Sequence, residues 1–220
     1  MRTAFILLIL AVMGAGSGCK KTEPPKVPTS TAATIPMTAA EIVQEQAVVA
    51  EIEKAGGCVT RVVYPPNGPV TGVDFMNPNV PNEVLDHLKE LKHLDSLSLS
   101  FTGLTDERLK HLEGLNNLQT LFLQNPEITD AGLVHLRGLV QLNHLDLGST
   151  KISDAGLEHL VGLNHLQILG LNETSVTETG LVRLKKLNEL KALYLRNTKV
   201  TDEGVKRLTD APPTWVIVRW

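Results

Sequence analysis

Leucine is distributed unevenly along this chain of 220 residues. Of the 35 leucines, three lie in the first ten residues, none lies between positions 11 and 84, and 32 lie between Leu85 and Leu208. In that last stretch the apolar spacing recurs every 24 residues, with units that open at Leu94, Leu118, Leu142, Leu166 and Leu190. A valine-rich unit that opens at Val70 precedes them. A fixed period of this length predicts a solenoid, in which each unit buries its apolar face only by stacking on its neighbours.

Each 24-residue unit predicts a short strand, a turn and a short helix. In the L-x-L segment the two leucines lie on the same side of a strand, because side chains alternate. A hydroxyl residue and an acid follow, as in Thr129-Asp130. The hydroxyl can cap free N–H groups at a helix start, and the acid lies at the positive end of the helix dipole. Leucines spaced by three, such as Leu133 and Leu136, then form one apolar stripe.

These units resemble the leucine-rich repeat family, which opens each repeat with L-x-x-L-x-L. They are more similar to a bacterial subtype whose second half reads T-x-[IV]-[ST]-D-x-G-L, here TKISDAGL at 150–157 and TKVTDEGV at 198–205. The resemblance implies an α/β arc with a parallel sheet on the concave face and short helices on the convex face. The family commonly has Asn or Cys at the ninth position, where this chain has Thr102 and Thr150. In the family, the residue at this position bonds to neighbouring backbone. The resulting ladder of asparagines is therefore not expected in this chain.

Two capping segments are expected around six repeats at 70–213. Residues 38–69 predict an N-terminal cap, with a helix that starts in a capping box of Thr38 and Glu41 and a strand from Cys58 to Tyr64. Residues 214–220 predict a closing β-strand. Its two tryptophans, Trp215 and Trp220, are expected to cover the leucines of the last repeat, and the alternative is an aromatic patch for a partner.

The N-terminus predicts export. Residues 1–18 contain Arg2 followed by an apolar run of about ten residues, which has the length of a signal-peptide core and is shorter than the roughly 20 residues of a membrane span. The segment Ser17-Gly18-Cys19 resembles the bacterial lipobox, which implies lipid attachment at Cys19, although Gly16 replaces the usual Leu. Ordinary cleavage near Gly18, which leaves Cys19 as a thiol, is the alternative.

A tether is expected after the anchor. Residues 19–37 are rich in Pro and Thr and have too little apolar surface to fold. The predicted location is therefore a membrane-anchored lipoprotein that faces the periplasm or the cell surface. In the way diderm bacteria sort their lipoproteins, the lysines that follow Cys19 favour the outer membrane.

Composition excludes several classes of function. The net charge is −3, and no cluster of Lys and Arg suggests a nucleic-acid partner. Two cysteines are too few for a disulfide scaffold or a four-cysteine zinc site. Cys58 is expected to pack as a small hydrophobic residue.

A row of histidines recurs with the same period, at His87, His111, His135 and His159. It is expected on the outer face of the helices, where Glu83 and Glu107 precede the first two histidines by four residues and can pair with them. The row is interpreted as a solvated feature copied by repeat duplication, and a transition-metal site is the alternative.

The outward positions of the strands predict the contact surface. The expected partner-binding residues are Phe122, His144, Asp146, Tyr194 and Arg196, because exposed aromatic and Arg side chains are typical of binding hot spots. His144 and Asp146 could pair, but Ser98 lies two strands from His144, which is roughly 9–10 Å. No nucleophile, third metal ligand or phosphate loop completes a catalytic set.

The sequence therefore predicts a non-enzymatic module without catalytic residues, cofactor, metal or small-molecule substrate. It is expected to bind a protein or peptide through the concave face while a lipid anchor holds it at a membrane. The alternative is a structural envelope lipoprotein with no dedicated ligand.

Overall fold

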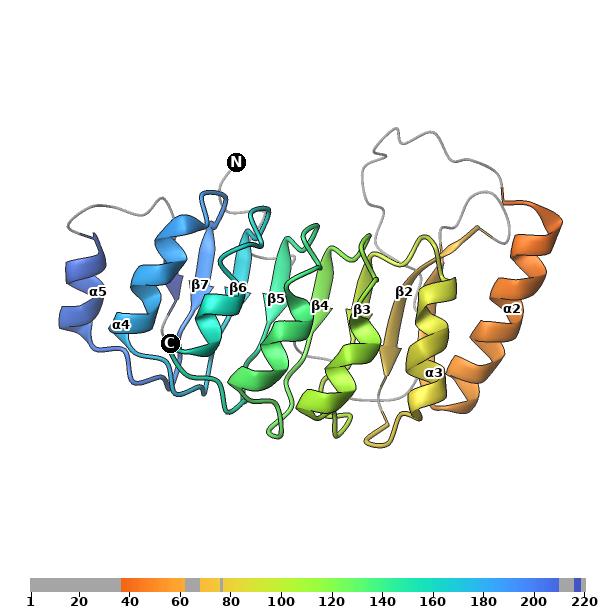
Figure 1. The fold of residues 1–220 in the computed structure, drawn as a ribbon, viewed down its shortest axis with the longest axis horizontal. Coiled ribbons are helices and arrows are strands. Elements are labelled where there is room, and N and C mark those ends of the chain that lie inside the picture. Colours follow the sequence, from red (N-terminus) through yellow and green to blue (C-terminus); the bar gives the residue numbers. More distant parts are fainter. Residues whose placement is uncertain (1–36, 62–67, 76, 210–215, 219–220) are drawn as a thin grey trace. The chain divides into compact units, whose positions relative to one another are not determined.

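The computed structural model describes residues 37–61, 68–75, 77–209 and 216–218. All of them lie in one compact unit, Pro36–Trp220. Its strands stand side by side in chain order, and helices cover one face of the sheet (Figure 1). The predicted leucine-rich repeat solenoid, with a parallel sheet on one face and short helices on the other, is confirmed.

The described residues contain one sheet in the order β1-β2-β3-β4-β5-β6-β7-β8. The strands are β1 (Gly57–Arg61), β2 (Val70–Phe75), β3 (Ser96–Ser98), β4 (Thr120–Phe122), β5 (His144–Asp146), β6 (Ile168–Gly170), β7 (Ala192–Tyr194) and β8 (Val216–Val218). Only β1 and β2 are antiparallel to each other. In the parallel part Leu97 lies level with Leu121, and Leu121 with Leu145. This register stacks the leucines of successive repeats into one continuous core.

The helical segments are short and mostly of the 3-10 type. They are α2 (Ala39–Lys54), α3 (Asn82–His87), η1 (Leu88–Glu90), η2 (Asp106–Leu112), η3 (Asp130–Leu136), η4 (Gly156–His159), α4 (Glu178–Leu181), η5 (Val182–Lys186) and α5 (Asp202–Thr209). A 3-10 helix has three residues per turn, so side chains at i and i+3 lie above one another. The spacing of Leu133 and Leu136 therefore suits η3, and both leucines are buried.

Aspartates at the helix starts join consecutive repeats. The Oδ1 atom of Asp130 accepts a hydrogen bond from the backbone N–H of Ser153 at 2.8 Å, and its Oδ2 atom accepts one from the Ser153 hydroxyl at 2.5 Å. Asp106 and Asp154 make the same pair of bonds with Thr129 and Thr177. The predicted helix cap is also present, because the hydroxyl of Thr129 accepts from the N–H of Ala131. The hydroxyl–acid pair thus caps its own helix and connects it to the neighbouring repeat.

The glycine two residues after the acid at a helix start leaves room for the aspartate of the preceding repeat. A Cβ atom at Gly156 would lie 2.3 Å from Oδ1 of Asp130, and one at Gly180 would lie 2.2 Å from Oδ1 of Asp154. Both distances are too short for any side chain. Glycine is therefore required at these positions by close packing between repeats.

Threonines close the turn after β3, β5, β6 and β7. The hydroxyl of Thr150 donates to the carbonyl of Leu147 at 2.6 Å, within its own repeat. Two repeats differ, because Pro78 and Pro126 occupy the threonine position. In the second of them the preceding Asn125 is fully buried. The Asn125 side chain accepts from the N–H of Thr102 at 3.0 Å and donates to the carbonyl of Leu99 at 2.7 Å. Asn125 thus bonds to the backbone of the preceding repeat. The family pattern does not predict this bond, because Asn125 stands at the eighth position of its repeat and not at the ninth.

The helix expected before the first repeat is present, and the expected strand is present as β1, Gly57–Arg61, while residues 62–64 of that prediction lie outside the described residues. Thr38 and Glu41 form the predicted capping box of α2, and Gly56 ends the helix with a φ of 80°. Glu45 on the inner side of α2 is buried, and its carboxylate accepts from Nη1 of Arg61 at 2.6 Å and from the N–H of Val70 at 3.1 Å. This ion pair joins α2 to the first two strands.

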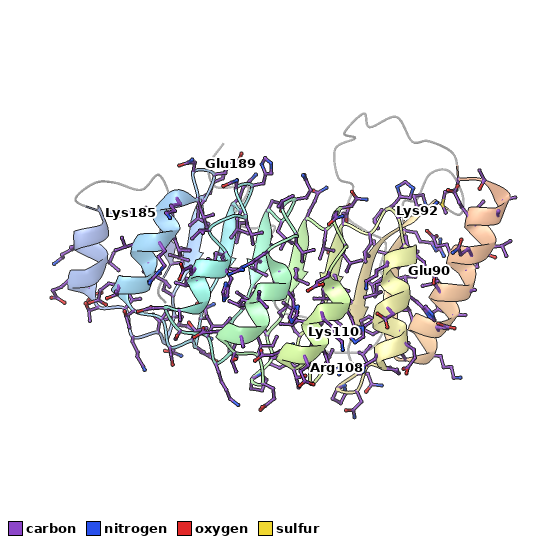
Figure 2. The ribbon with its side chains drawn as sticks, viewed as in Figure 1. Glu90, Lys92, Arg108, Lys110, Lys185 and Glu189 are labelled. Atoms are coloured by element: carbon purple, nitrogen blue, oxygen red, sulfur yellow. The ribbon has the colours of Figure 1, made fainter. Side chains whose placement is uncertain are left out.

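Charged side chains connect further repeats along the edges of the unit. Figure 2 shows Arg108 and Lys110 on η2 and Lys92 and Glu189 near the upper edge. Arg108 donates to Oδ1 of Asn82 at 2.7 Å, from one repeat to the preceding one.

Several predicted features lie outside the described residues. These are the export signal at 1–18, the lipid site at Cys19, nearly all of the tether, and both tryptophans of 214–220. Within the described ranges, no helix combines the length and the apolar character that crossing a membrane requires.

Candidate functional site

The exposed face of the sheet differs between its two halves. On β2 and β3 the outward side chains are Asp74, Ser96 and Ser98, which are small and polar. From β4 to β8 the outward side chains include Phe122, His144, Ile168, Ala192, Tyr194 and Val216. His144, Ile168, Ala192 and Val216 are level with one another on adjacent strands. The apolar and aromatic side chains therefore form one continuous area on the C-terminal half of the face.

Phe122 and His144 form an aromatic pair within this area. Their ring centroids are 4.9 Å apart at an interplanar angle of 75°, an edge-to-face contact. Burial lowers the pKa of His144, and the negative charge of Asp146 opposes that effect only in part. The imidazole is therefore neutral near pH 7 and presents an uncharged surface beside the phenyl ring.

The lowered pKa of His144 predicts a pH dependence of stability. The unfolded chain takes up this proton at the ordinary histidine value while the folded protein does not, so stability falls as pH falls through that value. We expect His144→Gln to lose less free energy of unfolding than the wild type when pH is lowered from about 7.5 to about 5. Urea unfolding of both proteins at the two pH values measures this difference. An equal loss in both proteins would show that His144 does not contribute.

Asp146 is buried, so its predicted place among the exposed partner-binding residues is wrong. Its side chain is 1% exposed, with Oδ2 accepting from Nε2 of Gln124 at 2.6 Å and Oδ1 accepting from the N–H of Gly148 at 2.9 Å. A Cβ atom at Gly170 on the next strand would lie 2.3 Å from Oδ1 of Asp146. Because Gly170 has no side chain, the carboxylate of Asp146 can occupy the space above it on the sheet. There it accepts the hydrogen bond that orients Gln124. Strand alternation alone does not reveal this, because the cause lies one repeat later.

Tyr194 and Arg196 lie on the far side of this area. Tyr194 is half-buried on β7, about three strand spacings or roughly 14 Å from Phe122. The Arg196 guanidinium is exposed, and its Nη2 atom lies 3.2 Å from Oε1 of Glu173. A hydrogen bond from Ser149, followed in size by one from Arg196, lowers the pKa of the Glu173 carboxyl. Arg196 is thus oriented by a charged neighbour while its side chain remains accessible.

The histidine row pairs between repeats. His111 lies with Nδ1 2.7 Å from Oδ1 of Asp86, and His135 with Nδ1 2.6 Å from Oε1 of Glu113. The expected pairing with glutamates four residues earlier is therefore wrong for His111, because residues four apart do not align on a 3-10 helix. In the part of the chain that the structure describes, no three His, Cys, Asp or Glu side chains converge as a metal site would require.

Cys58 does not pack as a plain thiol. It lies half-buried on β1, level with Asp74, and it is disulfide-bonded. The sequence contains one other cysteine, Cys19, which lies outside the described residues.

Comparison with known proteins agrees with the repeat geometry. A family model described as "Leucine Rich repeat" matches residues 141–161 and 186–208. No curated protein matches the sequence.

Solved structures similar to this chain include bacterial proteins. An internalin C2 from Listeria monocytogenes is 25% identical with a TM-score of 0.49, and the match covers 61% of this chain and 55% of that one. A second Listeria monocytogenes internalin is 22% identical with a TM-score of 0.43, covering 61% and 44%. A leucine-rich repeat protein from Leptospira interrogans is 23% identical with a TM-score of 0.45, covering 60% and 33%. The chain thus spans about half or less of each of these proteins.

The repeating strand, turn and helix and the match of two segments to the family model lead to one conclusion. The fold is a leucine-rich repeat solenoid, and the segments 141–161 and 186–208 match the leucine-rich repeat family.

Proposed function

We propose that this chain is a non-enzymatic binding module that recognises a protein or peptide through the concave face of its sheet. One observation carries the proposal: the edge-to-face pair of Phe122 and His144 shares a continuous, half-exposed area with Tyr194, and Arg196 lies at its border. Aromatic and Arg side chains dominate the binding energy of protein interfaces. The buried carboxylate of Asp146 accepts a hydrogen bond from the Gln124 side chain and so fixes its position beside this area.

The size of the face favours a small or extended partner. Eight strands about 4.8 Å apart, each with about four residues at 3.3 Å, give a sheet surface of roughly 400–450 Å². A standard protein partner covers about 800 Å². A peptide fits within the sheet alone, whereas a folded protein must also contact the flanking loops.

The double variant Phe122→Ala with Tyr194→Ala is expected to lose binding of the partner. Loss of two anchor side chains weakens binding at least about thirtyfold, because each hot spot contributes roughly 2 kcal/mol or more. Crosslinking in intact cells followed by purification of the tethered protein measures the set of bound partners.

The matched control is Ser96→Ala with Ser98→Ala, on the polar half of the same face. We expect this variant to retain every partner that the aromatic variant loses. If the variant Phe122→Ala with Tyr194→Ala retains the same partners, the concave site is refuted. The alternative of a structural lipoprotein without a dedicated ligand is then favoured.

We also propose that the module is exported and anchored by a lipid at Cys19. Cells grown with labelled palmitate should label the wild type and Cys58→Ala, while Cys19→Ala should remain unlabelled. The Cys58 variant is the control, since it removes the disulfide without removing the lipid site. Label on Cys19→Ala would refute the anchor, as would recovery of Cys19 of the wild type in a disulfide with Cys58.

A further inference from the structure

Phe101 is an exposed aromatic residue in a strained backbone conformation. It lies in the turn after β3, where its side chain is 62% exposed and its φ is 59°. Ser149, Glu173 and Asn197 hold the same position in later repeats and have φ angles of 54°, 60° and 55°. Those three residues are polar, and Asn is among the residues that enter this left-handed region most readily. A bulky aromatic residue there is an outlier, and neither its backbone angle nor its contact with water favours the folded chain.

The turn that carries Phe101 is fixed by the next repeat. The buried Asn125 side chain accepts from the N–H of Thr102 at 3.0 Å and from the N–H of Leu104 at 3.4 Å. The same side chain donates to the carbonyl of Leu99 at 2.7 Å, so it bonds to the backbone on both sides of Phe101. Strained residues persist where such contacts hold them, and they cluster at sites that contact ligands. Because the turn is already ordered, the ring loses little conformational freedom when it binds.

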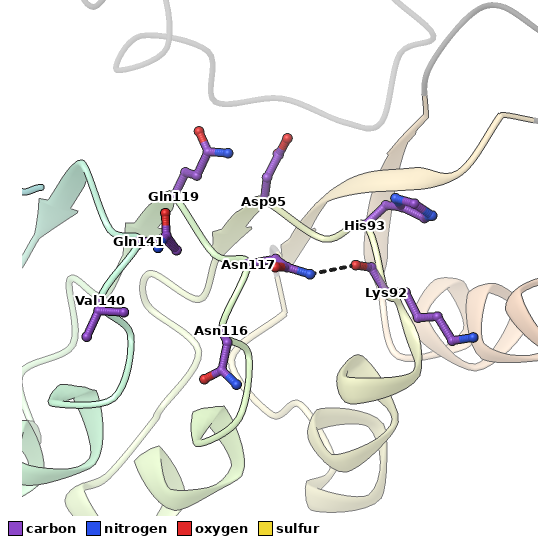
Figure 3. Close-up of a pocket in the computed structure, with 8 residues that line it drawn as sticks. All are labelled: Lys92, His93, Asp95, Asn116, Asn117, Gln119, Val140 and Gln141. Carbon is purple, nitrogen blue, oxygen red and sulfur yellow. Dashed lines mark hydrogen bonds between the residues drawn. The ribbon is translucent and has the colours of Figure 1, made fainter. Parts of the chain in front are cut away.

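The surface around this turn is apolar. Pro78 and Pro126 hold the same repeat position as Thr102 and are both exposed. The two repeats that replace the threonine with proline are therefore the neighbours of the repeat with Phe101. The other end of these strands is polar, since the groove where β3, β4 and β5 begin is lined mostly by amide and charged side chains (Figure 3). The end that carries Phe101 is thus the one suited to apolar contacts.

Phe101 adjoins the contact area proposed for the concave face. Its backbone N–H donates to the carbonyl of Gln124 in the next repeat at 2.9 Å. Gln124 follows Phe122 by two residues, and the Asp146 carboxylate orients its side chain. One strand spacing and two to three residues separate Phe101 from Phe122, which is roughly 8–10 Å between their Cα atoms. The two aromatic residues therefore belong to one continuous surface that extends beyond the end of β3.

The shape of this surface distinguishes between two kinds of partner. The sheet alone offers roughly 400–450 Å², about half of a standard protein footprint of about 800 Å². A protruding ring is removed from water only inside a pocket, which a folded protein can supply and an extended peptide cannot. We propose that the partner of the concave face is a folded protein with an apolar pocket that receives the Phe101 ring. This inference rests on the proposed function of the concave face and adds an anchor beyond the sheet.

Photo-crosslinking in intact cells tests the kind of partner. The full chain carries p-benzoylphenylalanine in place of Phe101, and the control carries it in place of Val182, which is 55% exposed on the helical face. We expect an adduct at position 101 that the control lacks. Mass spectrometry should place the crosslinks in two or more segments that are far apart in the partner's sequence. Crosslinks to a single short segment would indicate a peptide, and they would overturn the proposal, as would the absence of an adduct specific to position 101.

Phe101→Asn separates binding from folding. Asn tolerates a φ of 59°, so the urea midpoint of unfolding should rise above that of the wild type. The affinity for the crosslinked partner should fall at least about thirtyfold, the usual effect of losing a hot spot. Titration of the purified full chain with that partner measures the affinity, and weaker binding by a more stable variant excludes misfolding as its cause. Unchanged affinity, or a lower urea midpoint, would overturn the proposal.

Comparison with Phe122→Ala and Tyr194→Ala distinguishes this inference from the proposed function. Loss of the partner both in that double variant and in Phe101→Asn supports one continuous surface. If only the double variant loses the partner, the concave site stands and the anchor at Phe101 is refuted. If only Phe101→Asn loses it, the concave site is refuted, and the continuous surface with it.

Discussion

Gly180→Ala is expected to lower the free energy of unfolding by roughly 2–4 kcal/mol, because it breaks hydrogen bonds to a charged group. The new Cβ atom would lie 2.2 Å from Oδ1 and 2.7 Å from Cγ of Asp154. The carboxylate cannot move away freely, because it accepts from the N–H and the hydroxyl of Thr177 at 2.7 and 2.6 Å. Helix propensity alone predicts the opposite sign, since Ala is favoured over Gly in a helix by about 1 kcal/mol.

Urea unfolding distinguishes these two effects when a matched glycine is included. A Cβ atom at Gly162 would meet nothing within 4 Å, so Gly162→Ala should leave stability nearly unchanged. In an Asp154→Ala background the clash is absent, and Gly180→Ala should add little further loss. Equal effects at the two glycines, or full additivity with Asp154→Ala, would contradict the role given to this aspartate.

Glu45→Ala is expected to destabilise the N-terminal cap by about 3–5 kcal/mol, the usual effect of breaking a buried ion pair. The carboxylate is 5% exposed and accepts from both Arg61 and the N–H of Val70. Its removal leaves the Arg61 charge without its partner and a buried N–H without an acceptor. Because α2 covers the first repeat with Val48 and Ile52, detachment of the helix would also expose core residues to water.

Hydrogen exchange and urea unfolding measure this effect together. We expect faster exchange over α2 and β1 in Glu45→Ala and a lower midpoint of unfolding. Glu53→Ala is the matched control, since Glu53 lies on the same helix with an exposed side chain, and a change within about 0.5 kcal/mol is expected. If the two variants behave alike, the ion pair does not hold the cap in place.

Repeat spacing made the fold predictable because it reflects a local requirement. Every 24 residues the same apolar positions must be buried, and only stacking of the units achieves this. The order and register of the parallel strands follow directly, as the alignment of Leu97, Leu121 and Leu145 shows. The capping box at Thr38 and Glu41 was equally predictable, because it depends on residues three apart in the chain.

The accessible members of the candidate site were predictable only in part. Alternation along a strand placed Phe122, His144 and Tyr194 on the outward face, and all three are half-buried there. Alternation could not show that Asp146 is buried, since that depends on the absence of a side chain at Gly170. The 24-residue spacing of His87, His111 and His135 likewise did not reveal their partners, because each pairs with an acid outside its own helical turn.

The sequence by itself determined the repeat, the strand and helix positions and the residues that form the core, because these depend on apolar spacing within one unit. Only the tertiary structure decided how neighbouring units contact each other. The bond from Ser153 to Asp130, the space left by Gly156 and the burial of Asp146 each join residues that are about one repeat apart. Such contacts depend on atomic distances between stacked units, and a linear pattern contains no measure of those distances.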